Sequence, residues 1–320
     1  MGRPSGRSIT LEFATSEDTI YTARAGLVPI MDVAKKIKLP QAIDRVCAEL
    51  RHPSYVDFKA SEIVFLLAMG LLSGLFRVHQ ILASAELPFL AKLVNLTRIP
   101  VATTIARLFE RFDENAIVAM QAVTFDLGLK NIIYVDGYHI LVHDQSALQK
   151  YGKKMEGVEK GYGGTLKRGS LMLQSSLIVD AGMLTVLHLD IRPGSTSSFK
   201  GATAEMDSVL GKLPEAESGK QLVLADSAYG AGEYMRMCDT HAAHFILGVK
   251  NDAWMKGELA ELNFKRFKLG RENPDYGYRD FTADRKVWLG DAAEAPLFDD
   301  DWDGSRRVVV VRLPRDKGDP

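Results

Sequence analysis

The sequence contains only two cysteines, Cys47 and Cys238, among its 320 residues. Two cysteines are too few for a disulfide framework or for a zinc site built from thiolates, and this scarcity is typical of a reducing compartment. The basic residues at the N-terminus are not followed by the apolar segment of a secretory signal. We therefore expect a cytoplasmic protein.

Long apolar runs are also missing. The most apolar stretch, Ile63–Phe76, is shorter than the roughly 20 residues that a membrane-spanning helix requires. It predicts a helix buried in a protein core, and we expect no membrane partner.

An excess of basic residues is absent as well. The chain has 40 Lys and Arg against 41 Asp and Glu, which gives a net charge of −1 and a pI of about 6.7. The overall charge therefore does not indicate a polyanionic partner such as DNA. Basic residues do gather locally in residues 150–168, and in 264–268 they alternate with aromatic residues. Each cluster is compatible with a nucleic-acid surface and also with a solvated loop.

The composition that remains is that of a folded protein, with 46% hydrophobic and 25% charged residues, and the length allows two domains. We expect an N-terminal tail over residues 1–24 and a helical region over 25–128. Apolar periodicity predicts helices at 27–37, 42–50, 61–74, 78–85, 88–94, 101–112 and 115–127. The polar face of the helix at 101–112 carries arginines. They are compatible with a contact to DNA and also with a purely structural amphipathic helix.

Two apolar strands, each followed by an aspartate, organise residues 129–250. The strand 132–142 delivers Asp136, and the strand 221–225 delivers Asp226. Between them we expect a hairpin of strands 171–180 and 184–192 and a helix over 204–213; a helix at 231–240 and a strand at 244–250 follow. This order of strand, hairpin, helix, strand, helix and strand indicates an RNase H-like α/β domain.

Aspartates at strand ends can hold metal ions. Mg²⁺ prefers hard oxygen ligands, and two divalent ions about 3.5–4 Å apart can activate both oxygens of a phosphodiester displacement. A single aspartate after a strand is equally often a turn former or a helix N-cap. His139 and His143, with Asp144 beside them, lie on one face of the first strand; a zinc site or a hydrogen-bonding role beside the carboxylates would explain them.

In order and spacing the chain resembles the DDE transposases of bacterial insertion sequences, in the group whose RNase H-like domain carries a β-rich insertion. The segments that carry the resemblance are residues 134–137, 160–162, 190–195, 224–230 and 245–250. The resemblance implies a mixed α/β sheet with flanking helices, preceded by the all-α region and followed by the insertion at 251–320.

The resemblance also implies an activity. A DDE transposase cleaves DNA at the ends of its element and joins the freed 3′-hydroxyl to target DNA, so its partner is double-stranded DNA and it works as a homodimer in a synaptic complex. Asp136 and Asp226 would be the catalytic, metal-binding residues for Mg²⁺ or Mn²⁺. The residues expected to bind DNA are Lys160, Lys167, Arg168 and Arg192.

The third carboxylate of such enzymes does not match. In the family it follows the insertion in a Tyr-x2-Arg-x3-Glu-x6-Lys pattern; Tyr276 and Arg279 begin that pattern here, but Ala283 occupies the Glu position. We expect the chain to end before the helix that carries this Glu, which makes it a truncated transposase of reduced activity. Glu261, with Glu258 on the same predicted helix face, is the alternative.

Two other functions stay open at this point. A catalytically dead DNA-binding regulator of transposition, which forms mixed dimers with a full-length enzyme, would need no third carboxylate. An RNase H-like nuclease would cleave without joining strands.

Overall fold

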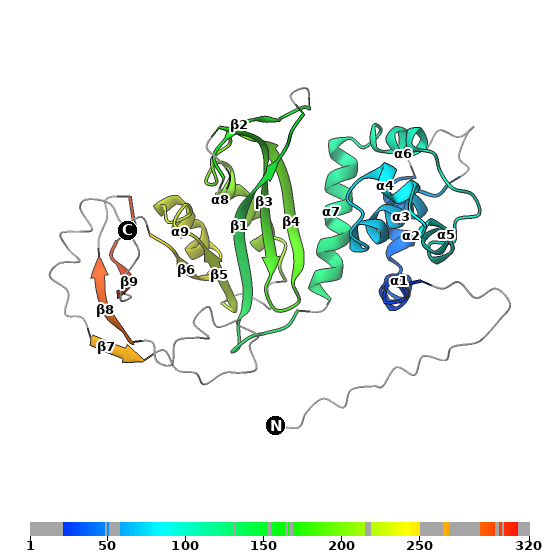
Figure 1. Ribbon diagram of the computed structural model, residues 1–320. Helices are drawn as coiled ribbons and strands as arrows, with labels where there is room; N and C mark the ends of the chain where they lie inside the picture. Colours follow the sequence, from blue (N-terminus) through cyan, green and yellow to red (C-terminus); the bar gives the residue numbers. More distant parts are fainter. Residues whose placement is uncertain are drawn as a thin grey trace. The chain divides into compact units, whose positions relative to one another are not determined.

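The computed structural model describes residues 22–48, 50, 58–130, 132–152, 155–163, 166, 169–214, 219–249, 265–268, 289–297, 301–302 and 304–312. The chain divides into two compact units, residues 1–123 and 124–320, which are described separately below (Figure 1). Within the described residues, no helix combines the length and the apolar character needed to cross a membrane.

The first unit is helical, as predicted. Its helices are α1 (Leu27–Lys36), α2 (Leu39–Val46), α3 (Ala60–Leu72), α4 (Val78–Leu82), α5 (Leu87–Leu93), α6 (Ala102–Phe109) and the first part of α7 (Glu114–Leu129). Leu66 of α3, Ile81 of α4 and Leu90 of α5 are almost fully buried and form its core. We predicted a break between two helices at Leu39-Pro40. Instead, Pro40 lies in the first turn of α2, where its missing N–H costs no hydrogen bond because the first N–H groups of a helix have no partner within the helix.

Helix α3 owes its start to a side chain from α2. The Asp44 carboxylate accepts hydrogen bonds from the backbone N–H of Ser61, at 3.0 Å, and from its hydroxyl, at 2.9 Å. The first N–H groups of a helix have no partner within the helix, so this contact satisfies one of them. It also ties α2 to the buried helix that fills the core.

The second unit contains a six-stranded mixed sheet. Its strands are β1 (His139–Gln149), β2 (Glu159–Gly161), β3 (Ser170–Asp180), β4 (Thr185–Pro193), β5 (Gln221–Ala225) and β6 (His244–Leu247). The order is β2-β3-β1-β5-β6, with β4 also paired to β3. Strands β1, β3 and β4 pair antiparallel, whereas β1, β5 and β6 pair parallel. The predicted RNase H-like α/β fold is therefore confirmed.

Helices α8 (Ala202–Leu210) and α9 (Gly232–Thr240) pack on one face of this sheet (Figure 1). Leu141, Ile178 and Val223, from three neighbouring strands, are fully buried there. Phe125 of α7 belongs to the same core. The second unit consequently begins within α7, earlier than the boundary at residue 129 that we expected.

The start of β1 differs from the prediction. We expected a strand from Ile132, but residues 135–138 form a tight turn in which the backbones of Val135 and Tyr138 exchange two hydrogen bonds of 2.9 Å. Asp136 and Gly137 both have positive φ, 50° and 86°, as a type I′ turn requires. An Asp-Gly pair favours this turn strongly enough to interrupt the apolar pattern. Asp136 therefore precedes β1 and does not lie at the exit of a strand.

A second, three-stranded sheet agrees with the β-rich region expected after residue 250. Its strands are β7 (Lys265–Lys268), β8 (Leu289–Leu297) and β9 (Arg306–Arg312), in the order β7-β8-β9. The helix predicted at 254–262, with Glu258 and Glu261, and the positions Tyr276, Arg279 and Ala283 lie outside the described residues.

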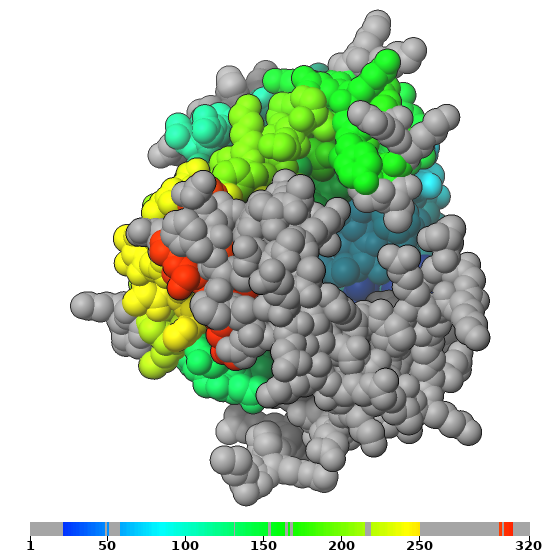
Figure 2. Space-filling model, turned by 90° about the vertical axis from the view of Figure 1, so that its left-hand side faces the viewer, coloured from blue at the N-terminus to red at the C-terminus, as the bar shows by residue number. Residues whose placement is uncertain are grey.

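The segment before β9 is anchored on α9. The Asp301 carboxylate accepts a hydrogen bond of 2.7 Å from the N–H of Gly232, the first residue of α9, and Trp302 is buried against Met235. Arg306 pairs with Asp239 at the other end of the helix. Figure 2 shows this C-terminal segment, in red, lying against the yellow surface formed by residues around α9 and β6.

Substitution of Leu141 tests the assignment of the core. Leu141→Ala should lower the free energy of unfolding by about 3 kcal/mol, because a fully buried leucine leaves a cavity. Leu148 lies on the same strand with 37% of its surface exposed, and Leu148→Ala should cost about 1 kcal/mol or less. Chemical denaturation measures both. Equal losses for the two variants would contradict the assignment.

Candidate functional site

The parallel pairing of β1 with β5 brings two aspartates together at the C-terminal end of β5. This end of the sheet is called the carboxylate edge below. The paired positions run from His139 opposite Gln221 to His143 opposite Ala225. Asp144 is the next residue of β1, which continues to Gln149, and Asp226 is the first residue after β5; both are exposed. Because the parallel register runs up to His143 and Ala225, the two aspartates that follow are neighbours.

Asp136 lies at the other end of β1. It precedes His139, and a strand rises about 3.3 Å per residue, so the stretch from His139 to His143 alone spans about 13 Å. Two catalytic metal ions lie only about 3.5–4 Å apart. The predicted pairing of Asp136 with Asp226 is therefore wrong in geometry, and Asp144 takes the place expected for Asp136.

The burial pattern of β1 explains why Asp144 is available. His139, Leu141 and His143 are buried, and Asp144 is exposed. Side chains alternate between the two faces of a strand, so Asp144 points away from the face that α8 and α9 cover. The sequence contained one signal for this, the Asp-Gly turn that ends the preceding segment.

Asp226 opens a tight turn. One of its carboxylate oxygens, Oδ1, accepts a hydrogen bond of 2.8 Å from the N–H of Ala228, and its carbonyl accepts one of 3.1 Å from the N–H of Tyr229. The turn passes close to Gly248, where an added Cβ would lie 2.6 Å from the backbone nitrogen of Ser227. A side chain at position 248 would displace this turn, so glycine there keeps Asp226 beside the middle of β1.

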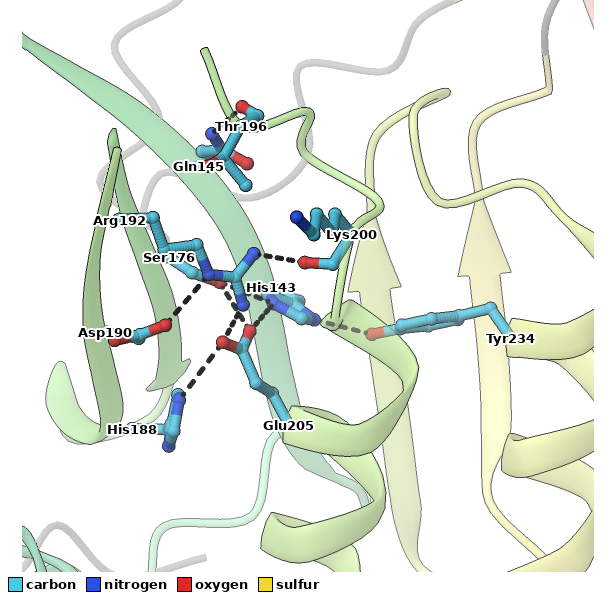
Figure 3. Close-up of polar contacts among 10 residues, drawn as sticks. All are labelled: His143, Gln145, Ser176, His188, Asp190, Arg192, Thr196, Lys200, Glu205 and Tyr234. Carbon is cyan, nitrogen blue, oxygen red and sulfur yellow. Dashed lines mark hydrogen bonds and ion pairs between the residues drawn. The ribbon is translucent and has the colours of Figure 1, made fainter. Parts of the chain in front are cut away.

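A buried polar network lies beneath this edge, on the face covered by α8 and α9 (Figure 3). The Tyr234 hydroxyl lies 2.9 Å from Nδ1 of His143, and Nε2 of His143 lies 3.1 Å from the Ser176 hydroxyl. Ser176 in turn donates a hydrogen bond of 2.6 Å to Glu205. Every contact is satisfied when His143 is neutral with its proton on Nε2.

The charge state of His143 agrees with this pattern. Burial first, and then the nearby positive charges of His188 and Arg192, lower the pKa of His143 to about 3. The imidazole Nε2 also lies 3.3 Å from Glu205, but the charge of that carboxylate is matched by Arg192. A neutral His143 therefore fits both the hydrogen bonds and the surrounding charge.

Arg192 is committed to internal contacts. It is 8% exposed, and its guanidinium donates to Asp190 at 2.9 Å, to the Lys200 carbonyl at 2.6 Å and to Glu205 in a close ion pair. The prediction that Arg192 contacts DNA does not fit this arrangement. Its side chain instead ties the loop after β4 to helix α8 (Figure 3).

Of the other residues predicted to bind DNA, the structure describes only Lys160. Lys160 is exposed on β2, which pairs with the part of β3 that lies opposite the end of β1. Lys160 therefore lies beyond the carboxylate edge of the sheet. Lys167 and Arg168 lie outside the described residues.

The residues fit an oxygen-ligated cation better than zinc. His139 is buried against Asp180, with 3.2 Å between Nε2 and Oδ2, and His143 belongs to the network above, so neither histidine is free to bind zinc. In the described parts of the chain, no group of three or more His, Cys, Asp or Glu side chains is arranged to hold a metal. Asp144 and Asp226 supply exposed carboxylates at one edge, the donor type that Mg²⁺ and Mn²⁺ prefer.

Comparison with known proteins places the chain among transposase sequences. The sequence profile of the family described as "Transposase DDE domain group 1" matches residues 4–319. The comparison with curated proteins gave no match.

Three solved structures show a low similarity to this chain. A piggyBac transposase synaptic complex with hairpin DNA is 10% identical, with 88% of this chain and 60% of that chain covered and a TM-score of 0.37. A Mos1 transposase paired-end complex with the left transposon end is 12% identical, with 61% and 60% covered and a TM-score of 0.25. A simian T-cell lymphotropic virus intasome in complex with a PP2A regulatory subunit is 15% identical, with 41% and 39% covered and a TM-score of 0.23. The chain thus spans 39–60% of these chains, and the likeness carries no inference about individual residues.

The ion pair between Arg192 and Glu205 should be important for stability. Glu205→Ala removes the more buried of the two carboxylates that pair with the Arg192 guanidinium and should lower the free energy of unfolding by about 3 kcal/mol. Asp207, on the same helix, forms an exposed pair with His241, and Asp207→Ala should cost about 1 kcal/mol or less. Chemical denaturation distinguishes the two variants, and a Glu205→Ala protein as stable as the wild type would contradict the role of the pair.

The neutral state of His143 predicts how stability depends on pH. Its folded pKa, about 3, lies below the ordinary value of 6.5, and burial also lowers the pKa of His188. Between pH 6.5 and 3 the unfolded chain binds protons that the folded chain does not, so stability should fall as the solution is acidified. His143→Gln should flatten this dependence by up to about 1.4 kcal/mol per pH unit. Denaturation in EDTA at several pH values measures it; identical slopes for the two proteins would contradict a neutral His143.

Proposed function

The chain belongs to the transposase DDE domain group 1 family, and we propose that it cleaves DNA at the ends of an insertion sequence and joins the freed 3′-hydroxyl to target DNA. The observation that carries the proposal is the juxtaposition of Asp144 and Asp226 at the shared edge of β1 and β5. Family membership supports the reaction class, and the two neighbouring carboxylates support a metal-dependent phosphodiester reaction.

Asp144 and Asp226 would hold a divalent cation, Mg²⁺ or Mn²⁺. When bound, such an ion activates an attacking oxygen and stabilises a leaving oxygen in phosphodiester chemistry. The contribution of the chain is to fix the two carboxylates: the strand pairing sets their separation, and the turn of residues 226–229 fixes the second. The buried network on the opposite face would hold His143, and with it this part of β1, in place.

DNA would approach this edge along its phosphates. Lys160 is exposed beyond the edge and can contact a phosphate oxygen as a point charge. Lys167 and Arg168 remain proposed contacts on the same segment of sequence. Arg192 would act indirectly, because it holds the loop that follows β4. We propose that two copies of the chain bring two DNA ends together, as transposition requires.

A second function is favoured by one specific observation. The edge carries two carboxylates in the described residues, whereas this class of enzyme uses three; Glu261, the alternative candidate for the third, lies outside the described residues. A chain that binds DNA without cutting it would regulate transposition. The presence or absence of metal-dependent cleavage separates these two functions.

The same chemical change at three aspartates tests the proposal. Asp144→Asn and Asp226→Asn should each lower Mn²⁺-dependent nicking of DNA more than about 100-fold, since even residues around metal ligands contribute about 10–100-fold. Asp136→Asn should retain wild-type activity, because asparagine is well accommodated at its positive φ.

The outcomes separate the alternatives. Loss of nicking in Asp136→Asn, with Asp144→Asn active, would overturn the assignment of Asp144. DNA binding by the wild-type chain without any metal-dependent nicking would support the regulator. Transfer of a pre-cut 3′-hydroxyl end to a second duplex would distinguish a transposase from a nuclease.

A further inference from the structure

An exposed tyrosine lies on a firmly held backbone at the end of β2. Tyr162 directly follows this strand, and 73% of its surface is exposed. Its carbonyl oxygen accepts a hydrogen bond of 3.0 Å from Nε2 of Gln174, which is buried. The glycines on both sides, Gly161 and Gly163, are packed so closely against their neighbours that neither position has room for a Cβ. The backbone of Tyr162 is therefore fixed, whereas its ring is open to solvent.

Tyr162 is directed to the same face of the sheet as Asp144. A Cβ added at either flanking glycine would lie 3.0 or 3.5 Å from the sulfur of Met172. Met172 is fully buried and lies on the same face of β3 as Ile178, which belongs to the core under α8 and α9. Because side chains alternate along an extended chain, the residue between the two glycines points to the opposite face, where Asp144 is exposed.

Two lysines belong to this face as well. Lys160 precedes Tyr162 by two residues, is exposed, and pairs with Leu171 of β3. On the other side of Leu171, the N–H of Lys150 donates a hydrogen bond of 2.9 Å to the Leu171 carbonyl. Lys150 lies six positions after Asp144 and therefore shares its face. Residues opposite each other on neighbouring strands also share a face, so the strand pairing and the alternation agree.

We propose that Lys150, Lys160 and Tyr162 form a binding surface for a DNA strand, in which the Tyr162 ring stacks on an unpaired base and the lysines contact phosphates. This inference rests on the proposed function, because it assigns the DNA contact of the same site. Basic side chains that follow the phosphates, combined with aromatic rings that stack on bases, are the usual means of binding single-stranded DNA. The fixed backbone favours binding, since little ordering has to accompany it.

Strand β1 sets the distance between this surface and the carboxylates. A strand rises about 3.3 Å per residue, so Lys150 lies about 20 Å beyond Asp144. Ser146 and Leu148, between them on the same face, are exposed, and a DNA strand can follow β1 over this distance. A stacked strand advances about 3.4 Å per nucleotide. The surface would therefore contact DNA about six nucleotides from the phosphodiester held at Asp144.

The chain offers a matched control for each kind of contact. Tyr151 is 85% exposed, but it follows Lys150 directly and alternation directs it to the other face. Lys220 is exposed at the start of β5, the end opposite to the carboxylate edge. Tyr151→Ala and Lys220→Ala remove the same chemical groups as Tyr162→Ala and Lys160→Ala and should leave DNA affinity unchanged.

The test measures binding of a fluorescent single-stranded oligonucleotide, and of its duplex, by anisotropy in EDTA, which prevents metal-dependent cleavage. Tyr162→Ala should weaken single-strand binding about tenfold and duplex binding less, whereas Tyr162→Phe keeps the ring and should bind like the wild type. Lys160→Ala should weaken binding of both and lower the slope of log affinity against log salt by about 0.7. All of these side chains are exposed, so the melting temperatures should match that of the wild type.

Unchanged single-strand affinity in Tyr162→Ala, or an equal loss in Tyr151→Ala, would overturn the role of Tyr162 and leave the proposed function to the nicking assay. Equal losses for the single strand and the duplex would overturn stacking on an unpaired base. Single-strand binding that depends on Tyr162, in a chain that does not nick DNA, would support this surface and overturn cleavage as the function. Absence of DNA binding by the wild-type chain would overturn both.

Discussion

The parallel hydrogen bonding between β1 and β5 is the interaction on which the candidate site depends. These strands are separated by more than 70 residues of sequence, yet their register fixes which side chains become neighbours at the edge of the sheet. A shift of one residue would turn Asp144 toward the helices and bury it, because strand side chains alternate between faces. The register is favoured by the fully buried Leu141 and Val223, which lie opposite each other in the core.

The two faces of β1 have opposite electrostatic character. One face carries Asp144 to solvent. The other buries His143 in a network in which a neutral imidazole, two hydroxyl groups and the ion pair of Glu205 with Arg192 satisfy one another. Keeping that network neutral overall avoids a second buried charge directly beneath the carboxylates. A cation would therefore be attracted to the exposed edge and not to the interior.

Much of this fold was predictable because its signals are local and repeated. The seven helices that the structure describes in the first region, the hairpin of β3 and β4, and the strand leading to Asp226 follow from apolar periodicity and turn residues. Asp136 was chosen wrongly because the apolar run before it resembles a strand, whereas the Asp-Gly turn at 136–137 separates that run from β1. At that point the turn preference of the Asp-Gly pair outweighed the β-propensity of the apolar residues. Apolar periodicity alone does not reveal such a turn.

The contacts of Arg192 and Glu205 could not be predicted from the sequence for a different reason. Arginine near the end of a strand in a DNA-binding family suggests a phosphate contact, and only the packing of α8 near β4 reveals that Glu205 pairs with it. Such roles depend on contacts between elements that are distant in sequence.

A disulfide between engineered cysteines tests the central claim most directly. Cysteines form a bridge when their Cα atoms lie about 4.4–6.8 Å apart, as neighbouring strand positions do, and the native Cys47 and Cys238 are buried. Mild oxidation of the Asp144→Cys/Asp226→Cys protein should give an internal crosslink, seen as faster migration on a non-reducing gel. The Asp136→Cys/Asp226→Cys protein should give none. A crosslink in the second protein and not in the first would contradict the pairing of Asp144 with Asp226.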